Sequence, residues 1–141
     1  MADNLDVKKW IRRSQMDFDT ASREAAIFRP PLEQVCFLCQ QSVEKILKAY
    51  SISRTGTRTR SHILIDLLDE CVPYSEEFNN FKVCCERLEP YVRLARYPAD
   101  IEPTEYHMKQ ALNDASAVLE FTKSKLKELG YEYLPEQDAP Q

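Results

Sequence analysis

The stretch LEQVCFLCQQSVEKILKAY, residues 32 to 50, decides the fold class because its apolar side chains recur every three or four positions. That period places them along one face of an α-helix. The resulting stripe consists of Cys36, Cys39, Val43, Ile46 and Tyr50. Pro31 precedes the stripe, at a position where a helix loses nothing from a missing N–H group. The stretch therefore predicts a helix with one buried face.

Helical spacing of apolar residues also covers most of the chain outside this stretch. It predicts further helices over residues 5–28, 62–71, 75–96 and 104–129. No segment alternates apolar and polar residues as a half-buried strand would, and only two glycines occur. We therefore predict an all-α fold, an antiparallel up-and-down bundle of four long helices and one short one.

Three residues near helix ends carry specific predictions. Ser61 is the expected N-cap of the short helix, because its hydroxyl can accept a hydrogen bond from a free N–H group. Pro90 lies inside the apolar stripe of residues 75–96, so we expect it to kink that helix without ending it. Gly130 is the expected C-cap of the last helix.

Composition and length favour one domain in the cytoplasm. The 141 residues are 43% hydrophobic and 30% charged, with no apolar run of about 18 residues that could span a membrane. The N-terminal sequence has no apolar signal-peptide core. We expect a bundle over residues 1–130 and a flexible tail over residues 131–141. The net charge of −4 disfavours broad coating of a nucleic acid.

Five cysteines raise the question of a metal site. Cys36 and Cys39 have the spacing of a zinc knuckle, but they lie on an apolar helix stripe and no second ligand pair has a suitable spacing. The odd count also argues against a closed set of disulfides. We therefore favour reduced thiols in the core, and predict neither a metal nor a cofactor.

The polar residues of the same stretch form a second helix face. Gln40, Glu44 and Lys48 step by four positions and so lie side by side. Such a stripe is either part of a binding site or an ordinary solvated surface. The solvated surface is favoured, because charged side chains are mostly exposed.

A locally basic segment follows in this acidic chain. No acidic residue occurs between Glu44 and Asp66, and the hydroxyl groups of residues 53, 55, 57, 59 and 61 lie among its basic residues. Together with the N–H groups at the start of the next helix, these groups suit a phosphate. The alternative is a mobile, solvated loop. His62 stands at the helix start, where the positive end of the helix disfavours a protonated ring.

The stretch VRLARYPADIEPTEYH, residues 92 to 107, places an arginine and a histidine on either side of a proline-containing loop. Arg96 has no obvious local partner, whereas Arg93 lies four positions after Glu89. Pro98 restricts the residue before it to an extended conformation, which fixes the direction of Arg96. Arg96 and His107 are thus candidates for a catalytic pair.

Several elements, in order, resemble the HEPN family, the nucleotide-binding helical domain of higher eukaryotes and prokaryotes. They are Trp10 and Ala21 in the first helix, CFLCQQSVEKILKAY (36–50), RSHILIDLL (60–68), LARYP (94–98) and an alanine-rich last helix. The resemblance covers about residues 5 to 129. It implies a bundle of about five helices that is commonly dimeric and often encoded beside a minimal nucleotidyltransferase in toxin–antitoxin-like pairs.

Many members of that family are metal-independent ribonucleases, which use an arginine followed after four to six residues by a histidine. Arg96 matches the arginine, but the histidine would have to replace Ile101, Glu102 or Pro103. His107 comes too late for this spacing. Because histidine is the residue suited to the proton transfer, we expect no catalysis by such a pair.

We therefore predict a non-catalytic helical binding module that forms a homodimer and either binds a nucleotide, pairs with a minimal nucleotidyltransferase, or does both; RNA is a further candidate ligand. The predicted phosphate-binding residues are Lys45, Lys48, Arg58, Arg60, His62 and Arg96. One alternative is a ribonuclease toxin that uses Arg96 with His107, or with His62 across a dimer. The other is a purely structural dimeric scaffold.

Overall fold

The computed structural model describes residues 4–95 and 101–132, and all regular structure in these residues is helical. The α-helices are α1 (Asn4–Ala25), α2 (Leu32–Thr55), α3 (Leu64–Cys71), α4 (Lys82–Leu88) and α5 (Glu105–Glu128). Three 3-10 segments lie around α4, namely η1 (Val72–Tyr74), η2 (Glu76–Phe81) and η3 (Glu89–Ala95). The predicted all-α bundle is confirmed.

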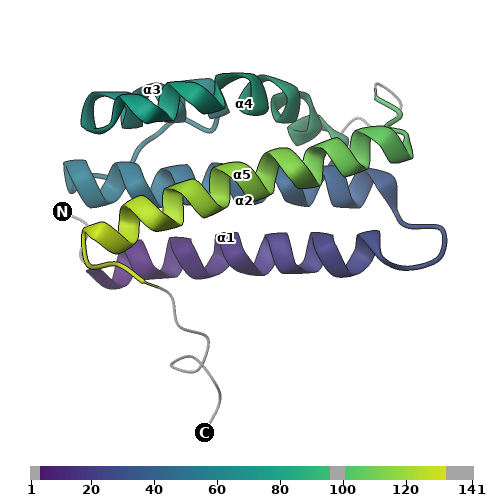
Figure 1. Cartoon of the computed structure of the whole chain (residues 1–141), viewed down its shortest axis with the longest axis horizontal. Coiled ribbons are helices and arrows are strands. Elements are labelled where there is room, and N and C mark those ends of the chain that lie inside the picture. Colours follow the sequence, from purple (N-terminus) through teal and green to yellow (C-terminus); the bar gives the residue numbers. More distant parts are fainter. Residues whose placement is uncertain (1–3, 96–100, 133–141) are drawn as a thin grey trace, which may run out of the picture.

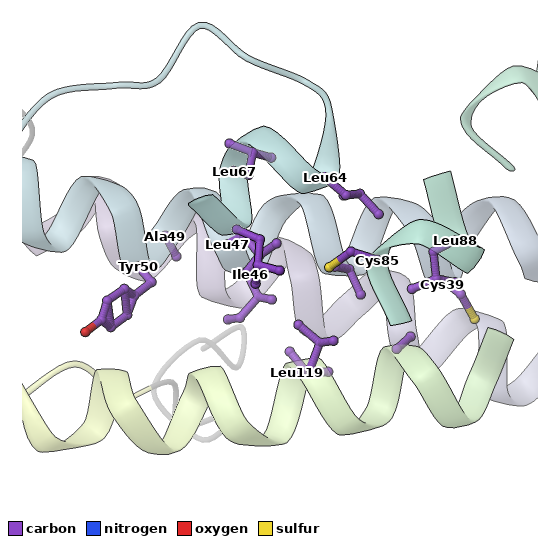
Figure 2. Packing of buried hydrophobic residues seen from close by; sticks show 14 of the residues in the cluster. Cys39, Ile46, Leu47, Ala49, Tyr50, Leu64, Leu67, Cys85, Leu88 and Leu119 are labelled. Carbon is purple, nitrogen blue, oxygen red and sulfur yellow. The ribbon is translucent and has the colours of Figure 1, made fainter. Parts of the chain in front are cut away.

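Helix α2 lies in the middle of the molecule (Figure 1). It runs antiparallel to α1, with α5 packed across it and α3 and α4 on a further side. Figure 2 shows Ile46 and Leu47 of α2 between Leu67 of α3 and Leu119 of α5. All four side chains are at most 1% exposed, so α2 contributes to the core on several faces.

Helices α1 and α2 meet through a pair of serines. The Ser14 hydroxyl donates to the Ser42 carbonyl at 2.6 Å, and the Ser42 hydroxyl donates to the Ser14 carbonyl at 2.9 Å. Both residues are fully buried. The small side chains let the two helices approach closely, and the reciprocal bonds leave neither hydroxyl without a partner.

Two helix ends differ from the prediction. Helix α1 ends at Ala25, three residues before the predicted end, and the chain then turns towards Pro30. Helix α2 continues five residues past Tyr50, because Ser51 and Ile52 are buried at 2% exposure each. Gly56 ends it in the left-handed conformation at φ 71°, donating its N–H to the Ile52 carbonyl at 2.8 Å.

The predicted fourth helix is instead divided into η2, α4 and η3. Pro90, which we expected to kink a continuous helix, lies in the 3-10 segment that follows α4. The buried residues of η3, Tyr91 and Leu94, step by three, as a 3-10 helix with three residues per turn requires. They follow Cys85 and Leu88, the buried residues of α4, at the same spacing. The prediction of four long helices is therefore wrong for this region, although its apolar stripe lies in the core.

The start of α3 also differs from the prediction. Its N-cap position is Ile63, and Ser61 accepts the N–H of Ile63 at 3.2 Å without capping the helix. The first N–H of the helix, from Leu64, is bound by Glu89 Oε2 at 2.8 Å. Glu89 belongs to η3, so the cap comes from 25 residues away in the sequence.

Helix α5 has defined ends. Thr104 and His107 form a capping box at its start. At its end Gly130 adopts φ 90°, and the N–H groups of Gly130 and Tyr131 bond to the carbonyls of Lys127 and Leu126. This is a Schellman motif, in which glycine follows the C-cap residue Leu129. Tyr131 packs against the core, and residues 133–141 of the predicted tail lie outside the described residues.

Candidate functional site

The polar stripe of α2 is buried, not solvated as we predicted. Gln40, Glu44 and Lys48 are 0%, 7% and 5% exposed. Helix α2 is covered by other elements on most of its faces, so the stripe falls inside the molecule. A buried charge is costly unless it is paired and hydrogen-bonded, so the partners of these residues decide what the stripe can do.

Lys48 is at the centre of a compact network. Its Nζ donates to Glu44 Oε2 at 2.9 Å and contacts His62 Nδ1 at 2.9 Å. The same nitrogen lies 5.3 Å from the centre of the Trp10 ring, a cation–π distance. Gln40 Nε2 lies 3.4 Å from Glu44 Oε1. Lysine, carboxylate and aromatic ring thus satisfy one another below the surface.

The path of the chain after α2 brings His62 to this network. Residues 56–63 double back along α2 before α3 begins, so His62 meets residues 14 and 18 positions earlier. The side chain of His62 is 74% exposed, whereas those of Lys48 and Glu44 are 7% and 9% exposed. His62 therefore connects the buried pair to solvent.

The contact with Lys48 favours one tautomer of the neutral His62 ring, because Nδ1 lies 2.9 Å from the Lys48 ammonium and farther, at 3.4 Å, from Glu44 Oε2. An ammonium group has no acceptor, so Nδ1 must accept the bond from Lys48. In the neutral ring the hydrogen is then on Nε2. His62 consequently offers a hydrogen-bond donor, not a base, on its outer side.

The other predicted cations differ in whether they form an ion pair. Lys45 forms an ion pair with Asp17 of α1. Arg58 makes a two-bond contact with Asp6, at 2.9 and 3.1 Å. Arg60 is exposed and has no ion pair with a described residue. Of the six predicted residues, Lys48 and His62 are brought into contact, while Lys45 and Arg58 are held by α1.

The hydroxyl groups of the loop do not form the predicted phosphate cradle. The five hydroxyl groups, of residues 53, 55, 57, 59 and 61, each donate a hydrogen bond to another group of the chain. Thr59 bonds to Glu70 at 2.8 Å and Ser61 to Asp66 at 3.4 Å, both on α3. The N–H of Leu64 at the start of α3 is taken by Glu89. Any phosphate would therefore depend on the outward-facing cations.

Side chains along the loop alternate in direction. Thr59 and Ser61 bond to carboxylates of α3, whereas Arg58 and His62 contact carboxylates of α1 and α2. By this alternation the side chain of Arg60 points to the same side of the loop as those of Arg58 and His62. Arg60 is exposed, and its guanidinium forms no ion pair with a described residue.

His107 has a structural role at the start of α5. The N–H of Thr104 donates to His107 Nδ1 at 3.0 Å, and the N–H of His107 lies 3.4 Å from Thr104 Oγ1. Nδ1 therefore accepts, as in His62, and in the neutral ring Nε2 carries the hydrogen. Arg96, the other member of the candidate pair, lies outside the described residues.

Four of the five cysteines are buried, as predicted for core thiols, and Cys84 is half-buried. Cys36 and Cys39 are fully buried and unpaired. Burial raises the pKa of the Cys36 thiol to about 11, although a hydrogen bond with Tyr91 acts in the opposite direction. Burial also raises the pKa of Cys85, to about 12. Such thiols stay protonated at neutral pH and are poor nucleophiles and metal ligands.

Sequence reasoning missed two members of the network. Trp10 was singled out only as a residue of the family resemblance, and Glu44 as part of a solvated stripe. A signal was present for Glu44, since residues 35–39 of α2 are all apolar. A helix that is apolar on every side is central, and polar residues further along it are buried too. Nothing in the sequence indicated the Trp10–Lys48 contact.

Two general features of the described part of the chain bear on function. Residues 4–95 and 101–132 contain no group of three His, Cys, Asp or Glu side chains placed to hold a metal ion. None of the helices in these ranges combines the length and apolar character needed to cross a membrane.

Comparisons with known proteins identify the family through one family model and the fold through two crystal structures. The model of the HEPN domain matches residues 7–126. The crystal structure of TT1696 from Thermus thermophilus is similar at a TM-score of 0.74 and 21% identity, covering 84% of this chain and 97% of that one. ST0689, an archaeal HEPN homologue, gives a TM-score of 0.66 and 24% identity over 84% and 96%. No curated protein matches the chain.

Proposed function

The chain belongs to the HEPN domain family, and we propose that it is a non-catalytic member that binds the phosphate of a nucleotide through Arg60 and His62. The proposed ligand is a nucleotide handled by a minimal nucleotidyltransferase, with which the chain forms a toxin–antitoxin-like pair. Lys48 supports the site from below, and it is the residue that holds the His62 ring in place.

The observation that carries the proposal is the contact between buried Lys48 and exposed His62. It turns the Nε2–H group of His62 outward, close in sequence to the free guanidinium of Arg60. A donor and a cation that face solvent together are suited to phosphate oxygens. Lys48 and Glu44 neutralise each other, so the charge at the surface comes from Arg60.

The partner part of the proposal rests on the family. HEPN domains are often encoded beside a minimal nucleotidyltransferase, and the chain's own net charge of −4 makes a long nucleic acid a poor ligand. A small phosphate compound that binds only at Arg60 and His62 is compatible with the negative net charge of the chain. The phosphate site then serves to hold a nucleotide that the partner supplies or consumes.

The ribonuclease alternative is not favoured by the geometry. His107 uses Nδ1 to cap α5, and His62 uses Nδ1 to accept from Lys48. In its neutral form each ring then presents a hydrogen on its outer nitrogen, whereas deprotonation of a ribose 2′-OH requires an unprotonated nitrogen. Purified chain incubated with RNA and a chelator should leave the RNA intact, and cleavage lost in Arg96→Ala would overturn the proposal.

Trp10 offers a direct readout of binding, because it is the single tryptophan and contacts Lys48. Titration with ATP, and separately with pyrophosphate, is expected to change its fluorescence. Arg60→Ala should weaken binding about tenfold, since a charge-assisted hydrogen bond contributes about 1.5 kcal/mol or more. Arg23→Ala, an exposed arginine at the far end of α1, is the matched control and should bind as the wild type does.

The outcomes separate the candidate functions. Equal affinity of Arg60→Ala and Arg23→Ala would reject this site, and absence of binding by the wild type would favour a structural scaffold. His62→Ala gives a second test, with circular dichroism to verify that α2 and α3 remain folded. Co-purification of a nucleotidyltransferase with the wild type but not with Arg60→Ala would place the partner at the same surface.

A further inference from the structure

The inner nitrogen of the His62 ring lies between two groups of opposite charge. Nδ1 is 2.9 Å from Lys48 Nζ and 3.4 Å from Glu44 Oε2. An ammonium only donates and a carboxylate only accepts, so the two neighbours suit different protonation states of the ring. The neutral ring accepts from Lys48 at Nδ1, whereas the protonated ring carries hydrogen on both nitrogens and needs an acceptor there.

Glu44 can supply that acceptor without giving up its present partners. Its Oε2 accepts from Lys48 at 2.9 Å, and its Oε1 lies 3.4 Å from Gln40 Nε2. A carboxylate has about four lone-pair sites, so Oε2 can accept a second hydrogen bond. The contact with His62 has to shorten only from 3.4 Å to about 2.8 Å, the length of a charged hydrogen bond. Because this shift is small, Nε2 of the ring keeps facing solvent.

Repulsion from Lys48 drives the same exchange of partners. A protonated ring 2.9 Å from the ammonium would place two positive charges in contact. His62 can move, because its side chain is 74% exposed and belongs to the segment before α3. The Lys48 side chain is 7% exposed and keeps Glu44 and the Trp10 ring as partners. The histidine is therefore the part that moves.

The other carboxylates around this loop are already in use. Three of them bond to residues on either side of His62, namely Asp6 of α1, Asp66 of α3 and Glu89 of η3. They accept from Arg58, from the Ser61 hydroxyl and from the Leu64 N–H. Among the described residues, Glu44 is thus the carboxylate in contact with Nδ1. The neighbouring cation on the loop is Arg60, which is exposed, so protonation of His62 adds a second positive charge beside it.

We infer that His62 exchanges Lys48 for Glu44 when it is protonated, and that the site takes up this proton when it binds a phosphate. The proton comes from solvent and adds to Nδ1, so the surface gains one positive charge. A phosphate bound by Arg60 and Nε2–H stabilises that charge, because a charged donor binds an anion more strongly than a neutral one does. The exchange of partners is a property of the free protein, whereas the proton uptake on binding rests on the proposed function.

Proton NMR and Trp10 fluorescence of the free protein test the exchange. The chain has two histidines, so His62→Gln and His107→Gln assign the two sets of ring resonances. Lys48 loses a partner when His62 is protonated, so Trp10 fluorescence should change at the same pH midpoint as the His62 resonances. His107→Gln, the matched control, should keep this change and His62→Gln should lose it. A signal that varies equally in both variants, or is absent from the wild type, would overturn the exchange.

Glu44→Gln tests the new partner itself. An amide stabilises an imidazolium less than a carboxylate does, so the midpoint of the His62 resonances should shift to lower pH. Circular dichroism verifies that the variant is folded, and the Trp10 measurement above decides the exchange if it is not. A folded variant with the midpoint of the wild type would show that the protonated ring does not use Glu44.

Sulfate tests the proton uptake, because its own charge is constant over roughly pH 5.5 to 8, where histidine titrates. Its affinity, measured through Trp10 at each pH, should rise as pH falls through the His62 midpoint, by up to about tenfold per pH unit for one proton. His107→Gln should keep this dependence and His62→Gln should lose it. Affinity that is equal across the range would overturn the proton uptake alone. A wild type that binds neither sulfate nor ATP would overturn the proposed function with it.

Discussion

At the scale of single residues, Lys48 shows how one side chain connects the core to the surface. Lysine has three donors and no acceptor, and here two of them are directed to Glu44 and His62 while the ammonium lies over Trp10. An arginine has a rigid planar head and would not fit the same three directions. The site therefore depends on lysine and not merely on positive charge.

Lys48→Met should destabilise the protein by about 3 kcal/mol, because it leaves the Glu44 carboxylate buried without its cation. Glu44→Gln added to this variant should recover much of the loss, since the amide removes the charge and can still bond to Gln40. Urea unfolding followed by circular dichroism measures both effects. A single variant as stable as the wild type would show that the pair contributes nothing.

The buried thiols predict a loss of stability in alkali. Burial raises the pKa of Cys36 to about 11 and that of Cys85 to about 12, from 9.0 in the unfolded chain. The folded state then holds protons that the unfolded state releases, so the free energy of unfolding falls as pH rises above 9. The slope is on the order of 1 kcal/mol per pH unit for each thiol.

Cys36→Ala tests this prediction with the wild type as its reference. The variant should show a shallower decline of unfolding free energy between pH 9 and pH 11, measured by urea titration at each pH. Tyrosines and lysines titrate in both proteins, so the difference isolates one thiol. Identical slopes would mean that Cys36 ionises as freely in the folded state as in the unfolded chain.

At the scale of secondary structure, the starts of two helices depend on side chains that accept a backbone N–H group. The Leu64 N–H of α3 is bound by Glu89, and the Thr104 N–H before α5 is bound by His107. The His107 cap comes from three residues away in the sequence, whereas the Glu89 cap depends on the tertiary structure. Local caps follow from sequence, whereas a cap from 25 residues away requires the fold.

His107→Gln should leave stability nearly unchanged, because glutamine is a common residue at this position of a capping box. His107→Ala should lose about 0.5–1 kcal/mol, since the Thr104 N–H loses its ring acceptor, while the backbone N–H of residue 107 can still donate to Thr104 Oγ1. Thermal unfolding of the two variants provides the comparison. Equal losses in both would show that the ring has a role beyond the cap.

Glu89→Ala should destabilise α3 by about 1 kcal/mol through loss of its cap, whereas Glu89→Gln should be nearly neutral at pH 7. Desolvation raises the pKa of Glu89, helped by Glu44 and Asp66 and opposed by the Leu64 bond. Its protonation therefore favours the folded state, a contribution that is present below pH 4.5 and lost as pH rises through the folded pKa.

Glu89→Gln removes this titration, so the stability of the variant relative to the wild type should rise from pH 4 to pH 7. Urea unfolding at several pH values is the measurement. A wild type that becomes relatively more stable than Glu89→Gln over this range would reverse the sign and contradict the assignment.

At the scale of the whole molecule, the sequence predicts well the burial that follows from the helical spacing of apolar residues. It predicts poorly the features that depend on how the helices pack together. The spacing of Val7, Ile11, Met108 and Ala115 predicts their burial, because one helix face must turn inward. The division of residues 76–95 into 3-10 and α segments is set by neighbours on α2, α3 and α5. Burial of Glu44 and Lys48 likewise follows from the central place of α2.

The same central place predicts how the molecule unfolds. Helix α2 contacts α1, α3, α4, α5 and η3, so loss of its packing should release every element together. Leu47 is fully buried on this helix, and Leu47→Ala should cost about 3 kcal/mol. Trp10 fluorescence reports on the contact between α1 and Lys48 of α2, while circular dichroism reports on all helices. The two urea transitions should coincide in wild type and variant, and an earlier fluorescence change would show that α1 separates before the rest.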